Sequence, residues 1–369
     1  MSIQSTHRPG RPHPALSRRA LLAGTAAGAV GLSLAACGKG KKSGSQAGSR
    51  ADSKTVTVVT HDSFHVSEDL QKAFTSETGY TLKVATSGDA GALVNKLVLT
   101  KDAPLGDAVF GIDNTYATRA LDQGVIDTSA TVTLPKGAES YVVADTPALA
   151  PIDVGDVCLN IDTGYFTGKG LTPPATFEDL TKPEYKGLLV AINPTNSSPG
   201  MAWLLATIGH FGAGSFAGYW KQLMANGARI AEDWSAAYEA DFSGSGKGTY
   251  PIVVSYASSP SFTVSKDKSS STTSALLDTA FRQVEYAGVL KGAANPEGGK
   301  AFVTWMLSKA VQEDIPGQMY MYPVLPDAAL PEALTKFGPL SKSPVKVEPK
   351  EITTHREEWL NTWTEAVGK

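Results

Sequence analysis

A run of serines around residue 255 is the first candidate for chemistry. Residues 253–262 have the sequence VVSYASSPSF, in which Ser255 and Ser258 follow two valines typical of a buried strand. A serine at a strand end becomes a nucleophile when a neighbouring histidine activates it. Ser255 is flanked by Val254 and Tyr256, so it lacks the G-x-S-x-G turn that exposes such a serine. We therefore expect no enzyme activity, and an exported serine hydrolase is the alternative.

A metal site is the second kind of chemistry to consider. His61, His65, Glu68 and Asp69 have a spacing that would suit a metal ion if they shared a helix. Asp62-Ser63 resembles a strand-to-helix turn instead, and no further histidine follows nearby. The sequence therefore predicts no metal and no cofactor, with these residues at the rim of a binding site.

Aromatic residues at element boundaries favour binding over catalysis. Trp234, Tyr256, Phe262 and Tyr320 lie beside helix starts, turns or prolines rather than inside apolar runs. Aromatic faces stack on flat rings and attract cations, worth roughly 0.5–2 kcal/mol each. Singly, each is more typical of a core residue, but together they predict a stacking box.

A helix start near residue 198 has two interpretations. Ser198 as the N-cap and Pro199 at the first helical position make an ordinary start that needs no ligand. The same geometry with Ser197 offers N–H groups and hydroxyls to a phosphate or carboxylate. The sequence leaves both interpretations open.

Alternating strands and helices would position these residues. The apolar periodicity predicts strands over Thr55–Thr60, Thr81–Ala85 and Asp107–Ile112, with helices over Asp69–Thr78 and Ala92–Leu99 and another ending near Ala120. This alternation is typical of a parallel sheet covered on both faces, whose ligands gather at the carboxyl ends of the strands. We expect one rim to hold 61–64, 87–89 and the pair Asp113-Asn114.

A second set of elements predicts a second lobe. It comprises strands Leu188–Ile192 and Tyr250–Tyr256 and helices Pro199–His210, Phe216–Ala225 and Trp234–Phe242. Extended stretches Pro151–Ile161 and Arg282–Leu290 would connect two α/β lobes around a cleft, and a single large α/β domain is the alternative.

The end of the chain carries further helices and core residues. We expect helices over Glu297–Val311 and Thr353–Val367 and no regular element over 315–324, which contains prolines. Trp359 and Trp363 are expected in the core.

The first residues indicate export. Arg18-Arg19 precede a short Gly/Ala-rich apolar run, and Leu34-Ala35-Ala36-Cys37 resembles a lipobox, whose cysteine is lipidated after cleavage. The composition of the Gly/Ser/Lys-rich stretch that follows predicts a flexible tether. With Cys37 lipidated, Cys158 has no disulfide partner and is expected in the core.

The charge excludes one class of partner. Removing the four arginines of the signal leaves 33 − 4 = 29 Lys+Arg against 36 Asp+Glu, a formal charge of 29 − 36 = −7. A mildly acidic exported domain argues against nucleic acid and is compatible with a cationic ligand.

Several stretches together resemble the thiamine-binding, solute-binding components of bacterial ABC importers, which have the type II periplasmic binding-protein fold. The stretches are V-T-H-D-S-F (59–64), G-D-A-G-A-L-V-N-K-L (88–97), D-A-V-F-G-I-D-N (107–114), N-P-T-N-S-S-P-G (193–200), D-W-S-A-A-Y (233–238), V-S-Y-A-S-S-P-S-F (254–262) and I-P-G-Q-M-Y-M-Y-P-V (315–324).

The resemblance implies roles for individual residues. Asp89 would face the cationic rings, Trp234 and Tyr256 would stack on them, and Ser197 would hold the hydroxyl or phosphate end. His61 departs from a tyrosine frequent in the family, Phe262 from a tyrosine and Tyr320 from a tryptophan. Phe262 cannot donate a hydrogen bond, which leaves the choice between thiamine and its phosphates open.

These observations lead to one expectation. We expect a two-lobed α/β protein that captures thiamine for an ABC permease and its ATPase, as a monomer anchored through Cys37 to the outer face of the cell membrane; the alternative is another solute, such as an iron complex, polyamine or sugar. The expected ligand-binding residues are His61, Asp89, Asn114, Ser197, Ser198, Trp234, Tyr256, Phe262 and Tyr320. The expected segments are an export signal (1–36), a tether (37–53), lobe 1 (54–152, with 286–335 returning to it), lobe 2 (153–285) and a C-terminal helical segment (336–369).

Overall fold

The structure is a computed structural model that describes residues 54–245 and 247–368. The described residues belong to one compact unit. The twin arginines, the lipobox with Cys37 and the tether lie outside the described residues, so the expectations about them stay predictions.

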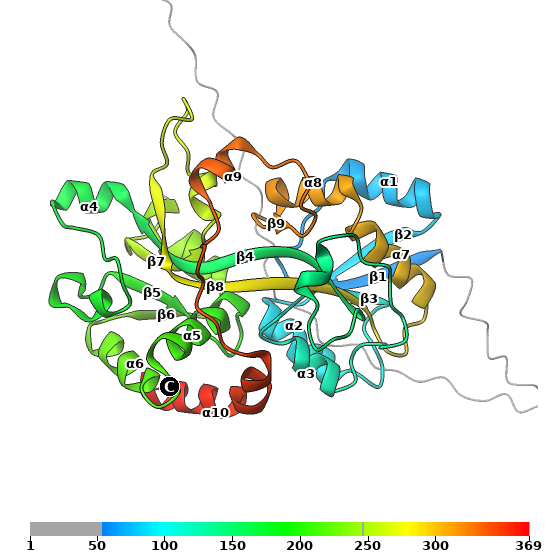
Figure 1. The fold of residues 1–369 in the computed structure, drawn as a ribbon, viewed down its shortest axis with the longest axis horizontal. Helices are drawn as coiled ribbons and strands as arrows, with labels where there is room; N and C mark the ends of the chain where they lie inside the picture. Colours follow the sequence, from blue (N-terminus) through cyan, green and yellow to red (C-terminus); the bar gives the residue numbers. More distant parts are fainter. Residues whose placement is uncertain (1–53, 246, 369) are drawn as a thin grey trace, which may run out of the picture. The chain divides into compact units, whose positions relative to one another are not determined.

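Nine strands form one mixed sheet in the order β2-β1-β3-β8-β4-β7-β5-β6, with β9 added beside β4. Strands β1 to β3 belong to the part that we call the first lobe, and β5 to β7 to the second lobe, while the long strands β4 and β8 pass through both (Figure 1). The strands are β1 Thr55–Thr60, β2 Thr81–Thr86, β3 Ala108–Asp113, β4 Leu149–Asp162, β5 Leu189–Ile192, β6 Arg229–Ala231, β7 Ile252–Tyr256, β8 Thr273–Val289 and β9 Tyr322–Pro323.

The first lobe follows the predicted alternation closely. Strand β1 has the predicted bounds and pairs in parallel with β2 and β3. Every residue of β3 is buried. Helices α1 Glu68–Thr78, α2 Ala90–Leu99 and α3 Ala117–Asp122 connect or follow these strands. In the view of Figure 1, α1 lies above the strands and α2 and α3 lie below them.

The second lobe repeats this arrangement with three parallel strands. Strand β5 pairs in parallel with β6 and β7. Helix α5 Ser198–Phe211 packs against β5 and β7, and helix α6 Phe216–Ala225, which has the predicted bounds, packs against α5. The predicted helix Trp234–Phe242 is a π-helix, η5 Ser235–Asp241, with Trp234 at its N-cap. π-Helical turns occur frequently at functional sites.

The two extended crossovers make the sheet mixed rather than parallel. Strand β4 pairs antiparallel with β7, β8 and β9, and β8 pairs antiparallel with β3. The parallel pairing expected from the alternation of strands and helices is present within the two sets of three strands, and the crossover strands add the antiparallel pairs. Strand β8 begins at Thr273, well before the predicted Arg282, because pairing with β4 continues as far as Asp162 opposite Thr273.

The region after β8 differs from the prediction in its helices. The expected helix Glu297–Val311 is two helices, α7 Pro296–Met306 and α8 Lys309–Gln318, because Ser308 between them has an extended ψ of 147°. The apolar periodicity continues across this break and so does not reveal it. Helix α8 also contains Pro316, so the expectation of no regular element from residue 315 is wrong. A proline in the last turn removes one hydrogen bond without ending the helix earlier.

Short elements complete the chain. They are α4 Thr163–Lys169 and α9 Glu332–Phe337 and the 3₁₀ turns Ala138–Tyr141, Glu178–Thr181, Pro183–Tyr185, Ser243–Ser245 and Ser259–Phe262.

Helix α10 Pro349–Val367 contacts α6 of the second lobe and α3 of the first, along the lower side of Figure 1. Trp363 is buried with its ring 5.7 Å from that of Trp220, and Trp359 is buried as well. Both tryptophans are thus core residues, as predicted. Cys158 is also buried, and burial raises the pKa of its thiol.

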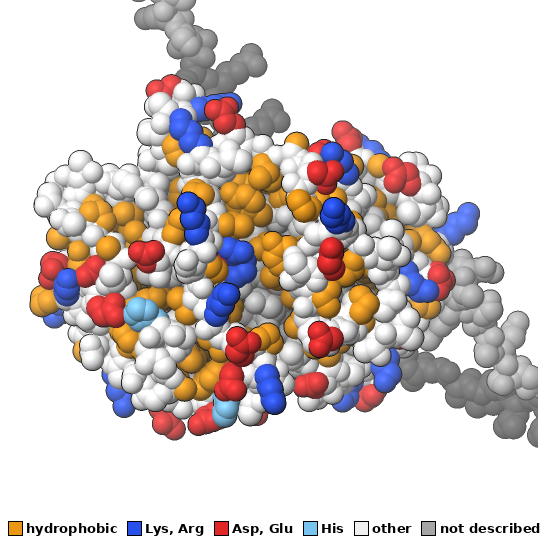
Figure 2. Space-filling view, viewed as in Figure 1, with side chains coloured by type: hydrophobic (Ala, Val, Ile, Leu, Met, Phe, Trp, Pro, Cys, Tyr) orange, Lys and Arg blue, Asp and Glu red, His pale blue; other side chains and the backbone are white. Residues whose placement is uncertain are grey.

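Among the described residues, every helix is too short or too polar to cross a bilayer. On the face in Figure 2, acidic and basic side chains are interspersed rather than gathered by sign.

Candidate functional site

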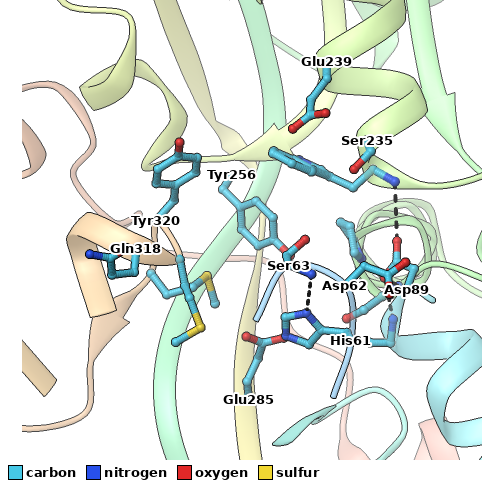
Figure 3. Close-up of a pocket in the computed structure, with 16 residues that line it drawn as sticks. His61, Asp62, Ser63, Asp89, Ser235, Glu239, Tyr256, Glu285, Gln318 and Tyr320 are labelled. Atoms are coloured by element: carbon cyan, nitrogen blue, oxygen red, sulfur yellow. Dashed lines mark hydrogen bonds and ion pairs between the residues drawn. The ribbon is translucent and has the colours of Figure 1, made fainter. Parts of the chain in front are cut away.

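A cavity of about 270 Å³ lies where elements of both lobes meet. The first lobe contributes the residues after β1 and the start of α2, and the second lobe contributes the starts of α5 and η5 and the end of β7. The lining residues are His61, Asp62, Ser63, Asp89, Ala90, Ser198, Pro199, Trp234, Ser235, Glu239, Tyr256, Glu285, Gln318, Met319, Tyr320 and Met321 (Figure 3).

His61 lies on the cavity wall directly after β1. Its Nδ1 accepts a hydrogen bond from the Ser63 N–H at 3.1 Å, which leaves Nε2 facing Glu285 Oε1 at 3.4 Å. Burial lowers the pKa of His61, but Glu285 raises it, with help from Asp89 and Asp62, so its pKa lies above the usual value. His61 therefore carries a proton more readily than an isolated histidine and pairs with Glu285 when it does.

Asp89 connects the two lobes. It is the N-cap of α2, where its Oδ1 accepts the Ala90 N–H at 2.6 Å and the Ser198 N–H of α5 at 3.4 Å. Its Oδ2 accepts the Trp234 N–H at 3.4 Å. Burial raises the pKa of Asp89, and hydrogen bonds from the Ser197 side chain and the Ala90 backbone oppose that rise. One carboxylate thus holds the start of a first-lobe helix against two helix starts of the second lobe.

Trp234 and Tyr256 present aromatic rings to the cavity from the second lobe. The Trp234 ring stacks on Tyr238 at 5.0 Å with an interplanar angle of 10°, because the two residues lie one turn apart at the start of η5. Trp234 Nε1 donates to Ser255 Oγ at 3.0 Å. The Tyr256 hydroxyl donates to Gln283 Oε1 at 3.3 Å, and burial raises the pKa of that tyrosine. These bonds fix both rings before any ligand arrives.

Tyr320 closes the opposite side of the cavity, in the connection between α8 and β9 (Figure 3). Its φ of 64° lies in the left-handed region, which is uncommon for an aromatic residue and marks a constrained backbone. Its ring lies against Phe262, with centroids 3.6 Å apart. Phe262 is 40% exposed and supports Tyr320 from outside the cavity lining.

A pair of buried carboxyl groups lies beside the cavity on the crossover strands. Glu285 of β8 lines the cavity and is the register partner of Asp153 on β4. Asp153 is fully buried, and burial raises its pKa well above the usual value, with Glu285 adding to the rise. Asp153 thus favours its neutral form beside Glu285.

The structure brings together six of the nine residues predicted from the sequence. His61, Asp89, Ser198, Trp234, Tyr256 and Tyr320 all line the cavity. Phe262 lies behind Tyr320, as described above. Asn114 lies away from the lining because its side chain donates to the Arg282 carbonyl at 3.0 Å and accepts the Val284 N–H at 3.1 Å.

Ser197 has a different place from the one predicted. It is fully buried, and as the N-cap of α5 its Oγ accepts the Gly200 N–H at 3.4 Å. The predicted N-cap, Ser198, is instead the first residue of the helix. The correction follows from backbone conformation, since Ser197 has an extended ψ of 133° and Ser198 is already helical.

Sequence reasoning missed several lining residues. Glu285 could have been noticed as a charged residue inside an otherwise apolar strand, and Glu239 as an acid one turn after Trp234. Gln318, Met319 and Met321 carry no such signal, because only the fold of the α8–β9 connection brings them to the cavity.

The residues considered from the sequence as a nucleophile or as metal ligands have the following contacts and exposure. Ser255 is buried and hydrogen-bonds to Trp234 and to Ser259 Oγ, 2.9 Å away. His65 is exposed, whereas His61 is buried and faces Glu285. Within residues 54–245 and 247–368, no group of three or more His, Cys, Asp or Glu residues is arranged to hold a metal ion.

Known proteins share this architecture. The chain resembles the thiamine-binding periplasmic protein of Salmonella typhimurium, at 27% identity over 85% of this chain and 94% of the relative. The corresponding protein of Haemophilus influenzae is 22% identical over 86% of this chain and 93% of its own length. A solved periplasmic thiamin binding protein superposes with a TM-score of 0.74 at 25% identity, covering 85% of this chain and 96% of that one.

A wider set of structures shares the fold alone. Iron-bound HitA from Pseudomonas aeruginosa superposes with a TM-score of 0.66 at 20% identity, over 85% of this chain and 99% of HitA. These neighbours confirm the expected two-lobed type II periplasmic binding-protein fold. Residues 107–338 match the family model described as bacterial extracellular solute-binding protein, and the chain belongs to that family.

Proposed function

We propose that this protein captures thiamine outside the cytoplasm and delivers it to an ABC importer. The observation that carries the proposal is the composition of the cavity, which combines the rings of Trp234, Tyr256 and Tyr320 with several carboxylates. Thiamine consists of two flat rings, one of them permanently cationic. Aromatic faces attract such a cation, and carboxylates offset its charge in a partly dehydrated site.

The relatives support this ligand. Those described above are named for thiamine binding, and the similarity extends over most of both chains. A shared fold would not be enough, because iron-binding HitA has it too. The ligand is therefore inferred from the cavity and the relatives together.

The mechanism is closure of the lobes around the ligand without covalent chemistry. Trp234 and Tyr256 belong to the second lobe, whereas His61 and Asp89 belong to the first. A ring placed among them contacts both lobes and so binds the closed arrangement more tightly than an open one. Asp89, which bonds to the starts of α2, α5 and η5, stabilises the same arrangement.

We also propose that the protein acts as a monomer anchored to the outer face of the cell membrane. The support is the twin-arginine segment and the lipobox ending at Cys37. The partners would be an ABC permease and its ATPase. If Cys37 carries the anchor, Cys37→Ser expressed in the native host moves from the membrane fraction to the soluble fraction; membrane retention of this variant would exclude this anchor.

Calorimetric titration of the full chain with thiamine tests the ligand. We expect saturable binding with one thiamine per chain, while ferric citrate and a polyamine give no heat beyond dilution. Trp234→Phe serves as a second readout, since thiamine should quench tryptophan fluorescence through Trp234 and this variant should lose most of the quenching. Binding of ferric citrate in place of thiamine would overturn the proposal, and turnover of a chromogenic ester would overturn the absence of covalent chemistry.

A further inference from the structure

A contact between the lobes outside the cavity centres on Tyr116. This tyrosine is the N-cap of α3 in the first lobe, and it is fully buried. Its hydroxyl donates to the Pro194 carbonyl at 3.1 Å, and Pro194 is a buried residue between β5 and α5 in the second lobe. Neither residue lines the cavity. Burial raises the pKa of Tyr116 to about 12, so its hydroxyl keeps its proton at neutral pH and remains a donor.

A basic side chain of the C-terminal helix lies over the face of the same ring. The guanidinium carbon of Arg356 is 4.3 Å from the centroid of the Tyr116 ring, and Arg356 is buried. Arg356 belongs to α10, which is attached to the second lobe where Trp363 packs against Trp220 of α6. A cation over an aromatic face attracts it more strongly when both are shielded from water. Tyr116 is therefore held both by the second lobe, at its hydroxyl, and by α10, at its ring face.

The two lobes approach each other closely beside this tyrosine. The Ala92 N–H of α2 donates to the Asn196 carbonyl at 3.1 Å. A methyl group at Gly91 would lie 2.6 Å from the Asn196 carbonyl oxygen and 2.6 Å from the Tyr116 hydroxyl, which is closer than side chains pack. The glycine at position 91 therefore allows α2 to lie directly against the backbone of the second lobe.

These contacts exist only while the lobes are closed. Tyr116 and Gly91 belong to the first lobe, whereas Pro194 and Asn196 belong to the second, and the long strands β4 and β8 connect the two. Rotation of one lobe about β4 and β8 separates these partners and exposes the Pro194 carbonyl to water. Contacts that are made only in the closed arrangement raise the affinity for a ligand that this arrangement encloses.

We infer that Tyr116 and Arg356 form a latch that determines how long the closed lobes retain their ligand, without touching the ligand. The inference rests on the proposed function and deepens it, because it assigns a share of the affinity to residues outside the cavity. Both are positioning residues, since they act through the arrangement of the lobes. The C-terminal helix α10 thereby takes part in ligand retention.

The test is stopped-flow dissociation of thiamine from the full chain, followed by tryptophan fluorescence. Tyr116→Phe keeps the ring and leaves the buried Pro194 carbonyl without its donor in the closed arrangement. We expect thiamine to dissociate about fivefold to tenfold faster from this variant. Arg356→Gln should accelerate dissociation by about threefold or more. The association rate constants should change by less than about threefold, because neither residue contacts the ligand.

Tyr219→Phe is the matched control for Tyr116→Phe. Tyr219 of α6 is also buried, and its hydroxyl donates to the Phe177 carbonyl at 2.9 Å, but donor and acceptor belong to the same lobe. Both variants remove one buried hydroxyl. Tyr219→Phe should lower the unfolding free energy measured in urea and leave the dissociation rate of thiamine unchanged.

Gly91→Ala tests the close approach of the lobes independently of Tyr116. Alanine favours a helix over glycine, so this variant should not weaken α2 itself, whereas its methyl group meets the Asn196 carbonyl. We expect thiamine to bind about tenfold more weakly in calorimetric titration. Gly218→Ala in α6 adds the same methyl group at an exposed position with nothing within 4 Å, and it should bind thiamine as the parent chain does.

The outcomes separate this inference from the proposed function. Dissociation rates within about twofold for the parent chain and Tyr116→Phe would overturn the latch while supporting thiamine capture. Equal acceleration by Tyr116→Phe and Tyr219→Phe would also overturn it, because a general loss of stability would then explain the effect. Failure of the parent chain to bind thiamine would overturn the proposed function, and the inference with it.

Discussion

The pH dependence of stability around Asp113 offers a quantitative test of the structure. Asp113 ends β3 and is fully buried, where its Oδ1 accepts the Thr115 N–H at 2.9 Å and the Thr115 hydroxyl at 2.7 Å. Burial raises the pKa of Asp113 to about 6; the hydrogen bonds from Ser198 and Thr115 oppose the rise, and Glu285 adds to it. Ionisation of Asp113 therefore lowers the stability of the folded state, although its carboxylate accepts the Ser198 hydroxyl at the start of α5.

Whether this group stabilises the protein at low or at high pH depends on the pKa of Asp113 in the folded and in the unfolded state. The pKa of Asp113 is about 6 in the folded protein and near 3.8 in the unfolded chain, so the folded state binds the proton more tightly. Its contribution to stability is complete below pH 3.8 and is lost as the pH rises through 6. The difference of about 2.2 pKa units corresponds to about 3 kcal/mol. No reduction for solvent screening applies, because the carboxyl group is fully buried.

The variant Asp113→Asn removes this titration while keeping the shape of the side chain. Urea unfolding of the parent chain and the variant, at steps from pH 4 to pH 8 without ligand, gives the difference in unfolding free energy. We expect this difference to shift in favour of the variant by roughly 2–3 kcal/mol between pH 4 and pH 7 and to stay constant above pH 7.

Asp127→Asn is the matched control. Ser129 hydrogen bonds lower the pKa of Asp127, which lies near the surface, so its contribution is lost as the pH falls below the usual range. Its free-energy difference should therefore be flat between pH 5 and pH 8. A flat difference for Asp113→Asn over pH 4–7 would refute the reasoning, because it would mean that burial does not raise the pKa of Asp113.

Two further predictions separate the core from the cavity. Trp363→Ala should lower the unfolding free energy by about 3–5 kcal/mol, since the Trp363 ring is buried against Trp220. In calorimetric titration the same variant should change thiamine affinity by less than about twofold. A loss of affinity without a loss of stability would contradict the core role of Trp363. Ser255→Ala removes the acceptor of Trp234 Nε1 and should weaken thiamine binding about tenfold in a fluorescence titration. Ser261→Ala removes a hydroxyl that donates to the Ser258 carbonyl outside the cavity lining, and this control variant should bind thiamine as the parent chain does. Equal effects of the two serine variants on thiamine binding would argue against positioning of the Trp234 indole ring by Ser255.

Local patterns predicted most of the regular elements. The β-branched run Thr55–Thr60 and the apolar spacing of Phe216–Ala225 depend on short-range periodicity, and both have the predicted bounds. Trp234 and Tyr256 were predicted at the site because they lie at element boundaries, which are visible in one sequence, and because they match aromatic residues of the family that the sequence resembles. The break at Ser308 was missed because the periodicity of the flanking helices continues across it.

Long-range contacts account for what the sequence could not predict. Ser198 reaches Asp113, and Asp89 reaches Trp234, only because the sheet brings distant segments together. Those contacts pair the backbone N–H and the hydroxyl of Ser198, at the start of α5, with the carboxylates of Asp89 and Asp113. Glu285 likewise enters the site through the register of β8 against β4, which no local pattern specifies.

The position of β8 in the sheet has a consequence for how the chain assembles. β8 lies between β3 and β4, with Val289 opposite Ala108 and Gly288 opposite Leu149. Strand β3 is buried throughout in the finished protein, so until Val289 has been synthesised one edge of it has no partner strand. An unpaired apolar edge invites pairing with another chain, whereas the three parallel strands of the second lobe are complete by Tyr256. The first lobe, whose strands come first in the sequence, therefore completes its part of the sheet after the second lobe. The unpaired edge of β3 is the point most vulnerable to aggregation during biosynthesis.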